Sequence, residues 1–227
     1  MGRVSAARPI LPDPPAAKRP VPAALTRAGM TVYSGLDDPA SHWVRLVIAE
    51  KDIDGLHMEW VKPGQTIEDL LTLDPEQAVP LLADREVVLN VPRIVVEYLD
   101  ERYPHPPLMP VEPSARAKLR LALHRIEHDL FPLVNSIRSG PVAVAQKARK
   151  LLLENLLAGT PVFAAKNYFL SSDFSCVDAL WATLLWRLPA LGIDLPASAR
   201  PIQRYADRLF GRAAFQHSLT PAERALR

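Results

Sequence analysis

Proline residues surround one histidine in the segment 104–107, which reads Pro104, His105, Pro106 and Pro107. Proline fixes its own φ angle and lacks an amide N–H, so the segment is expected to be stiff and extended. A stiff segment loses little conformational entropy when a partner docks on it. The imidazole of His105 can donate or accept a hydrogen bond, and its ordinary pKa is near ~6.5. We therefore expect an exposed docking segment with His105 as its one titratable group.

Two neighbouring hydroxyl side chains could act as nucleophiles or stabilise a thiolate, Ser34 and Tyr33. Such groups work when a base or a lowered pKa activates them. Successive strand residues point to opposite faces, so at most one of the two faces a shared site. The alternative is a turn serine beside a packed strand aromatic, with no chemistry.

Cys176 is the single cysteine. One cysteine excludes an internal disulfide framework and any CxxC redox pair, and it fits a reducing compartment, so we expect a cytoplasmic protein. Because Cys176 opens a very apolar helix, we interpret it as a small core residue.

A metal site is possible only at His124 and His128, which lie four residues apart on one helix face. No third ligand accompanies them, so we interpret them as solvated helix residues. Glycine-rich phosphate loops, HExxH and Ser-His-Asp signatures are absent from the sequence. We expect neither a metal nor a cofactor.

The positive charge of the chain is concentrated at its start. Of the net charge of +2, residues 1–29 hold five basic residues and one acidic residue, or +4, which leaves −2 for the remaining 198 residues. The body thus gives no electrostatic reason to expect direct nucleic-acid binding. The first 29 residues are rich in proline, alanine and arginine and are predicted to be a disordered extension. No apolar run approaches the ~20 residues of a membrane span, so a membrane association is not expected.

From Met30 the pattern alternates between strands and helices. Strands are predicted at 30–35, 56–62 and on both sides of a turn at Asp84–Arg85; helices are predicted at 40–52, 67–75 and 91–103. The order predicts a compact α/β domain over 30–106, followed by a linker over 107–113.

Residues 114–227 are predicted to form an all-helical domain. Helices are expected at 114–139, 141–158, 174–188 and 198–210, with Gly159 ending the second. Pro132 should bend the first helix rather than end it, because the apolar pattern continues beyond. Ser175 and Asp178 form a capping box at the start of the third helix, which is apolar nearly all round and should be buried. The last residues, TPAERALR, form a short amphipathic segment that either packs back on the domain or reaches a partner.

An α/β unit with X-Pro before a strand, followed by an all-helical domain, resembles the glutathione transferase fold over residues 30–227. This resemblance implies a thioredoxin-like domain and then a helical domain. QAVP (77–80) is similar to that family's loop, in which Pro80 would be cis and the backbone of Val79 would pair with glutathione.

Within that superfamily, long segments resemble the stringent starvation protein A family: YSGLDDPASHWVRLVIAEKD, VEYLDERYPHPPLMPVEP, LHRIEHD, LLWRLPALGI and SLTPAERALR. This resemblance implies a non-catalytic, dimeric transcription regulator that contacts RNA polymerase and its primary sigma factor around Pro-His-Pro. The dimer would use helix 91–103 and the long helix from Ser114, and a heterodimer with a paralogue stays possible. Glu112 stands where the family often has an aromatic residue, so we place it on the partner face.

The same resemblance implies a degenerate glutathione site made of Ser34, Asp38, Val79, Pro80, Val91 and Pro92. Asp38 stands where cysteine-type relatives keep the thiol, and a carboxylate repels a thiolate. Val91 and Pro92 stand where an acid and a serine normally hold a carboxylate of glutathione, and an unpaired ligand carboxylate costs a few kcal/mol. We therefore favour a non-enzyme. The alternative is a glutathione-dependent transferase or isomerase that uses Ser34 or Tyr33.

Overall fold

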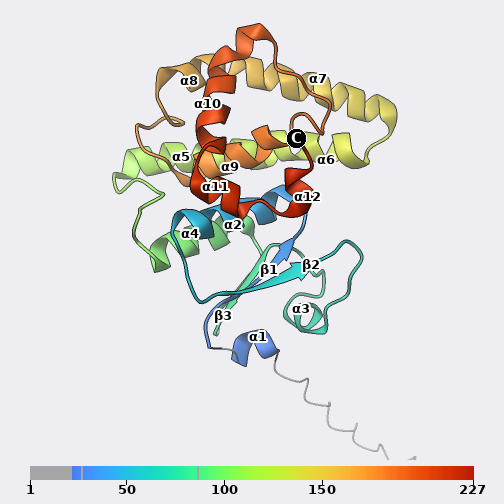
Figure 1. The fold of residues 1–227 in the computed structure, drawn as a ribbon, viewed down its shortest axis with the longest axis vertical. Helices are drawn as coiled ribbons and strands as arrows, with labels where there is room; N and C mark the ends of the chain where they lie inside the picture. The colour runs from blue at the N-terminus through green and yellow to red at the C-terminus, as the bar shows by residue number, and fades with distance from the viewer. Residues whose placement is uncertain (1–21, 27, 86) are drawn as a thin grey trace, which may run out of the picture.

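The computed structural model of the chain describes residues 22–26, 28–85 and 87–227. Figure 1 shows a sheet with its helices at one end and a larger group of helices at the other. The four strands are β1 (Thr31–Gly35), β2 (His57–Val61), β3 (Leu81–Asp84) and β4 (Val87–Leu89), in the order β2-β1-β3-β4. β1 pairs with β2 in parallel, and β3 pairs antiparallel with both β1 and β4.

Strand alternation divides the side chains of the sheet between two cores. Val32 and Leu82 face α2 (Pro39–Glu50) and α4 (Pro92–Arg102) and belong to the large core cluster. Tyr33 points the other way, into a small cluster with Leu70 of α3 (Glu68–Leu73). These strands and helices lie where the sequence predicted them.

One helical turn lies inside the extension that was predicted to be disordered. Ala23–Thr26 forms α1, whose Ala24 is buried in the small cluster. The Ala23 N–H donates to Asp69, 3.1 Å away. The prediction of disorder is therefore wrong for this turn, because one alanine finds an apolar site on the sheet. Residues 1–21 and 27 of the predicted extension lie outside the described residues.

The long helix predicted over 114–139 continues through Pro132, but its middle changes type. It consists of α5 (Pro113–Arg125), a π-helical turn η1 (Ile126–Leu130) and α6 (Phe131–Ser139). The Phe131 N–H reaches the carbonyl of Ile126, one residue further than in an α-helix. Because Pro132 cannot donate a backbone hydrogen bond, the wider π-helical turn before it lets the helix continue past the proline.

The remaining helices pack around α9 (Cys176–Trp186), as Figure 1 shows. They are α7 (Val142–Ala158), α8 (Thr160–Ala165), the 3₁₀ turn η2 (Ala197–Ala199), α10 (Arg200–Phe210), α11 (Ala213–Ser218) and α12 (Pro221–Arg224). The predicted capping box at the start of α9 is confirmed, since the Ser175 N–H lies 2.9 Å from the Asp178 carboxylate. None of the helices in the described part of the chain has both the length and the apolar character that a membrane span requires.

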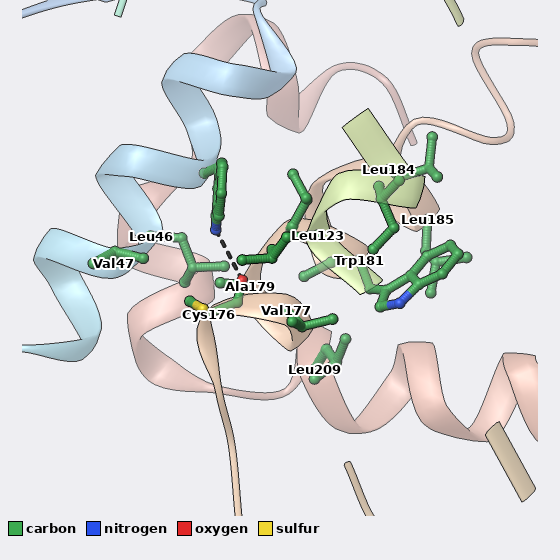
Figure 2. Close-up of a cluster of buried hydrophobic side chains, with 14 of the residues drawn as sticks. Leu46, Val47, Leu123, Cys176, Val177, Ala179, Trp181, Leu184, Leu185 and Leu209 are labelled. Atoms are coloured by element: carbon green, nitrogen blue, oxygen red, sulfur yellow. Dashed lines mark hydrogen bonds between the residues drawn. The ribbon is translucent and has the colours of Figure 1, made fainter. Parts of the chain in front are cut away.

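One hydrophobic core joins the sheet and the helical part. Figure 2 shows Leu46 and Val47 of α2 beside Cys176 and Ala179 of α9. The indole N–H of Trp43 on α2 also donates to the carbonyl of Cys176, 2.9 Å away. These contacts between α2 and α9 hold the sheet and the helical part in one arrangement. They therefore also determine where the segment between α4 and α5, which links the two parts, lies.

Candidate functional site

Residues 103–109 join α4 to the start of the helical part. They are here called the docking loop, after the role that the sequence analysis expects for residues 104–107. Its residues 104–107 are exposed, as the sequence predicted. The predicted extended path is wrong: the chain bends, the His105–Pro106 peptide bond is cis, and the carbonyls of Tyr103 and Pro106 both turn inward. The tip therefore presents proline rings and one imidazole, with His105 as its only residue carrying an amide N–H.

A buried lysine receives the two inward carbonyls. The Lys51 ammonium lies 2.6 Å from the carbonyl oxygen of Tyr103 and 2.8 Å from that of Pro106. Its third partner is the Asp100 carboxylate, 2.7 Å away. Asp100 also accepts the N–H groups of Leu108 (2.8 Å) and Met109 (3.1 Å). One ion pair thus contacts the backbone of the docking loop at four residues.

Sequence reasoning missed this ion pair. Lys51 follows the last turn of α2 and has the appearance of a solvated helix end, although its side chain is fully buried. Asp100 lies four residues after Val96 on the apolar face of α4, which is the one signal that could have pointed to a buried acid. Forty-nine residues separate the two partners, so no local spacing pairs them.

The far end of the docking loop is set into the core. Leu108 and Met109 are buried, and the Cys176 N–H donates to the carbonyl of Leu108, 3.0 Å away. The Cys176 thiol lies 3.0 Å from the sulfur of Met109. Burial raises the pKa of this thiol well above its ordinary value, with nearby carboxylates adding to the effect. Cys176 is therefore the core residue that the sequence indicated.

Glu112 has a capping role that the sequence analysis did not assign. Its carboxylate accepts the N–H groups of Ser114 (2.9 Å) and Ala115 (2.6 Å) and the Ser114 hydroxyl (2.7 Å). These hydrogen bonds lower the pKa of Glu112. The bond from the Ser114 hydroxyl has the largest effect, and the two N–H groups add to it. The side chain is exposed, but its oxygens point back to the first turn of α5, so it fixes the start of that helix.

A cleft of about 620 Å³ lies where the glutathione transferase resemblance places a ligand. Asp38 and Val79 line it together with charged and polar residues, among them Lys62, Gln77 and Arg138. The Val79–Pro80 peptide bond is cis, which confirms that expectation. Val91 and Pro92 begin α4 outside this lining, and Val91 makes no side-chain cap. The structure thus brings together only part of the predicted degenerate site.

Neither predicted hydroxyl opens into the cleft. Tyr33 is buried in the small cluster, and Ser34 is buried on the opposite face, as strand alternation predicted. The Ser34 oxygen accepts a hydrogen bond from Arg45 at 2.5 Å, and its hydroxyl donates to the carbonyl of Gly35 at 3.3 Å. Asp38 caps α2 by accepting the Ser41 N–H at 2.6 Å. The groups closest to the expected reaction centre therefore have structural partners.

The chain end packs back on the body and completes a buried charge network. Glu223 of α12 lies 2.6 Å from the Arg45 guanidinium and 2.5 Å from that of Arg187. Arg187 also donates to Nδ1 of His42, 3.0 Å away. His42 Nδ1 lies 3.7 Å from a Glu223 carboxylate oxygen. Burial is the main cause that lowers the pKa of His42, and the positive charges of Arg187 and Arg45 lower it further. The ring is therefore neutral. A neutral ring leaves Nε2–H to donate to the Ser218 hydroxyl at 3.0 Å.

The two histidines of the long helix pair with each other. Nδ1 of His128 donates to the carbonyl of His124, 2.9 Å away, and the rings lie 4.0 Å apart. Within residues 22–26, 28–85 and 87–227, no group of three or more His, Cys, Asp or Glu side chains could hold a metal ion.

The family comparisons agree with this architecture. Residues 36–107 match the family described as "Glutathione S-transferase, N-terminal domain", and residues 121–213 match "Glutathione S-transferase, C-terminal domain". Among solved structures, glutathione transferase Omega 3C from Trametes versicolor is similar with a TM-score of 0.77 at 20% identity, covering 87% of each chain. The protein therefore has the glutathione S-transferase fold, with a thioredoxin-like domain followed by a helical domain.

Two curated relatives are more similar in sequence than this transferase structure is, and both are named "Stringent starvation protein A homolog". The one from Coxiella burnetii is 42% identical over 204 residues, or 89% of this chain and 97% of that protein. The one from Pasteurella multocida is 45% identical over 198 residues, or 87% of this chain and 93% of that protein. The chain belongs to the stringent starvation protein A family.

Proposed function

We propose that this protein is a non-catalytic transcription regulator of the stress or starvation response, and that it associates with RNA polymerase and its primary sigma factor through the docking loop. The observation that carries the proposal is an exposed Pro-His-Pro tip held on buried anchors. Such a surface is preorganised, so docking loses little conformational entropy. The single buried thiol is consistent with action in the cytoplasm.

The state of the cleft supports a non-enzymatic role. A thiol-transferring enzyme needs a hydroxyl or thiol that can reach the bound thiol. Here Ser34 is buried under Arg45, and Asp38 adds a negative charge where a thiolate would sit. Proline at position 92 removes a helix N-terminal N–H that could hold a carboxylate.

Substitution of the tip tests the proposal. We expect His105→Ala and Pro106→Ala to keep the fold and the dimer while reducing copurification of RNA polymerase about tenfold or more. His217→Ala removes another exposed histidine, far from the docking loop in sequence, and serves as the matched control. Circular dichroism and native mass measurement check the fold and assembly. Unchanged capture of polymerase by both tip variants would rule out this role for the docking loop.

We further propose a homodimer that uses α4 and α5. Ile94 on α4 and Leu121 on α5 are each more than half exposed, at 51% and 54%. Arg120 and Glu97 pair across the same two helices, 2.7 Å apart, so the helices present one joint surface. Ile94→Asp should shift the native mass toward the monomer. A mass that shows a second, different chain would identify a heterodimer with a paralogue instead.

A glutathione-dependent transferase or isomerase is the second candidate, because a cleft lined by Asp38 and Val79 lies where the resemblance places glutathione. Retention on immobilised glutathione, together with turnover that Ser34→Ala abolishes, would establish this enzyme. Absence of both would favour the regulator.

A further inference from the structure

We propose that Lys51 and Asp100 are positioning residues for the docking surface: their buried ion pair sets the shape in which residues 104–107 meet a partner. This inference rests on the proposed docking function. Neither side chain forms part of the surface that a partner would meet, since that of Lys51 is fully buried and that of Asp100 is 10% exposed. They act through the backbone of the docking loop.

The lysine determines where the tip begins and ends. An ammonium group has three N–H donors, and here the three acceptors are the Asp100 carboxylate and the carbonyls of Tyr103 and Pro106. Because both carbonyls meet one nitrogen atom, the chain between them must turn outward. That turn contains Pro104 and His105.

The aspartate fixes the return of the chain. Oδ1 of Asp100 accepts the Leu108 N–H and contacts Lys51, while Oδ2 accepts the Met109 N–H. These two amides come directly after Pro107. The backbone on both sides of the tip is therefore bound to the same ion pair. Among the described residues, Lys51 and Asp100 are the only side chains that hydrogen-bond to the backbone of residues 103–109.

This arrangement explains how a loop with few bonds of its own can be rigid. Proline limits φ at three tip positions but leaves each ψ angle adjustable. If the backbone of the loop becomes ordered only when a partner binds, the conformational entropy lost at that step lowers the binding affinity. With the ion pair in place, the four contacted backbone residues are ordered beforehand. Without it, the same tip residues would remain but in many arrangements.

The test compares variants of the full-length protein for binding to purified RNA polymerase holoenzyme by surface plasmon resonance. Lys51→Met and Asp100→Asn each break the ion pair, and the double variant Lys51→Met/Asp100→Leu removes both charges, so that no unpaired charge stays buried. Arg212→Met is the matched control: it breaks the Glu50–Arg212 ion pair, 2.6 Å, which links α2 to the chain between α10 and α11. Hydrogen exchange of the Leu108 and Met109 amides reports the order of the docking loop independently of binding.

We expect the double variant to stay folded, to exchange these two amides about a hundredfold faster, and to bind polymerase at least about tenfold more weakly. Arg212→Met should change both quantities less than about twofold, even if it lowers the melting temperature equally. This separates a positioning role from a general loss of stability.

Two results would overturn the inference. Unchanged exchange in the double variant would show that the ion pair does not order the docking loop. Faster exchange with unchanged binding would show that order in the loop is irrelevant to docking. If His105→Ala still weakens binding in that second case, the proposed function stands and only the positioning role fails. If neither His105→Ala nor the double variant weakens binding, the proposed function fails, and the positioning role fails with it.

Discussion

The carboxylate of Glu223 lies 2.6 Å from the guanidinium of Arg45, although 178 residues separate them in sequence. The same carboxylate contacts Arg187 at 2.5 Å, and its own short helix is capped by Thr220, whose hydroxyl accepts the Glu223 N–H at 3.1 Å. Arg45 continues the connection to Ser34 of β1. A residue near the end of the chain is therefore bonded to both halves of the fold.

Glu223→Gln should lower the free energy of unfolding by about 3–5 kcal/mol, because it removes the counter-charge of the buried Arg45 and leaves Arg187 with the more distant Asp37, 3.8 Å away. Denaturant unfolding followed by tryptophan fluorescence measures this change. Glu154→Gln is the control, since its pairing with Lys150 is exposed and 3.9 Å long, and it should change stability by less than about 1 kcal/mol. Equal effects from both substitutions would contradict the importance of the network.

Stability should fall in mild acid because of His42. Burial and the neighbouring arginines lower the pKa of His42 in the folded state, whereas the unfolded value is near ~6.5. The unfolded chain therefore binds the proton first, so stability present above pH ~6.5 is lost as the pH falls, at up to about 1.4 kcal/mol per pH unit. Unfolding free energies of the parent and of His42→Gln between pH 8 and 5 should converge with that slope. Parallel curves would show that the ring is not held neutral.

Ser34→Ala should affect stability rather than catalysis. The hydroxyl is a partner of Arg45, so its loss should cost about 1–2 kcal/mol of unfolding free energy. Retention on immobilised glutathione should be no different from that of the parent protein. Thr66→Ala, which changes a hydroxyl in the cleft lining, is the matched substitution and should leave stability nearly unchanged.

The Cys176 thiol should be unreactive in the folded protein. It is completely buried, and burial raises its pKa, so both access and thiolate formation are suppressed. Labelling with a thiol reagent at neutral pH should be about a thousandfold or more slower than in denaturant, because it requires opening of the core. Rapid stoichiometric labelling under native conditions would mean that the start of α9 opens readily.

Local patterns predicted the elements that these residues belong to. Alternation placed Val32 and Tyr33 in different cores, and the Ser175–Asp178 spacing predicted the start of α9. The proline-flanked His105 marked the exposed tip. These features depend on a few neighbouring residues, and the physical rule that governs each acts over that short range.

The partners of the buried charges could not be predicted in the same way. Nothing near Lys51 indicates Asp100, and nothing near Arg45 indicates Glu223, because these pairs form only when separate helices pack. Ser34 illustrates the consequence. The sequence allowed either a reactive hydroxyl or an unreactive turn residue at this position. In the structure, Ser34 accepts a hydrogen bond from Arg45, which itself pairs with Glu223 of α12.

Leu108 and Met109 are buried against the first turn of α9. This packing limits how the docking loop could be transplanted into another protein. A chimera that carried residues 103–109 alone onto another transferase-fold protein would lack the buried residues that contact this segment. The portable unit is larger: it includes Lys51, Asp100 and the residues around Cys176, which come from three separate stretches of sequence.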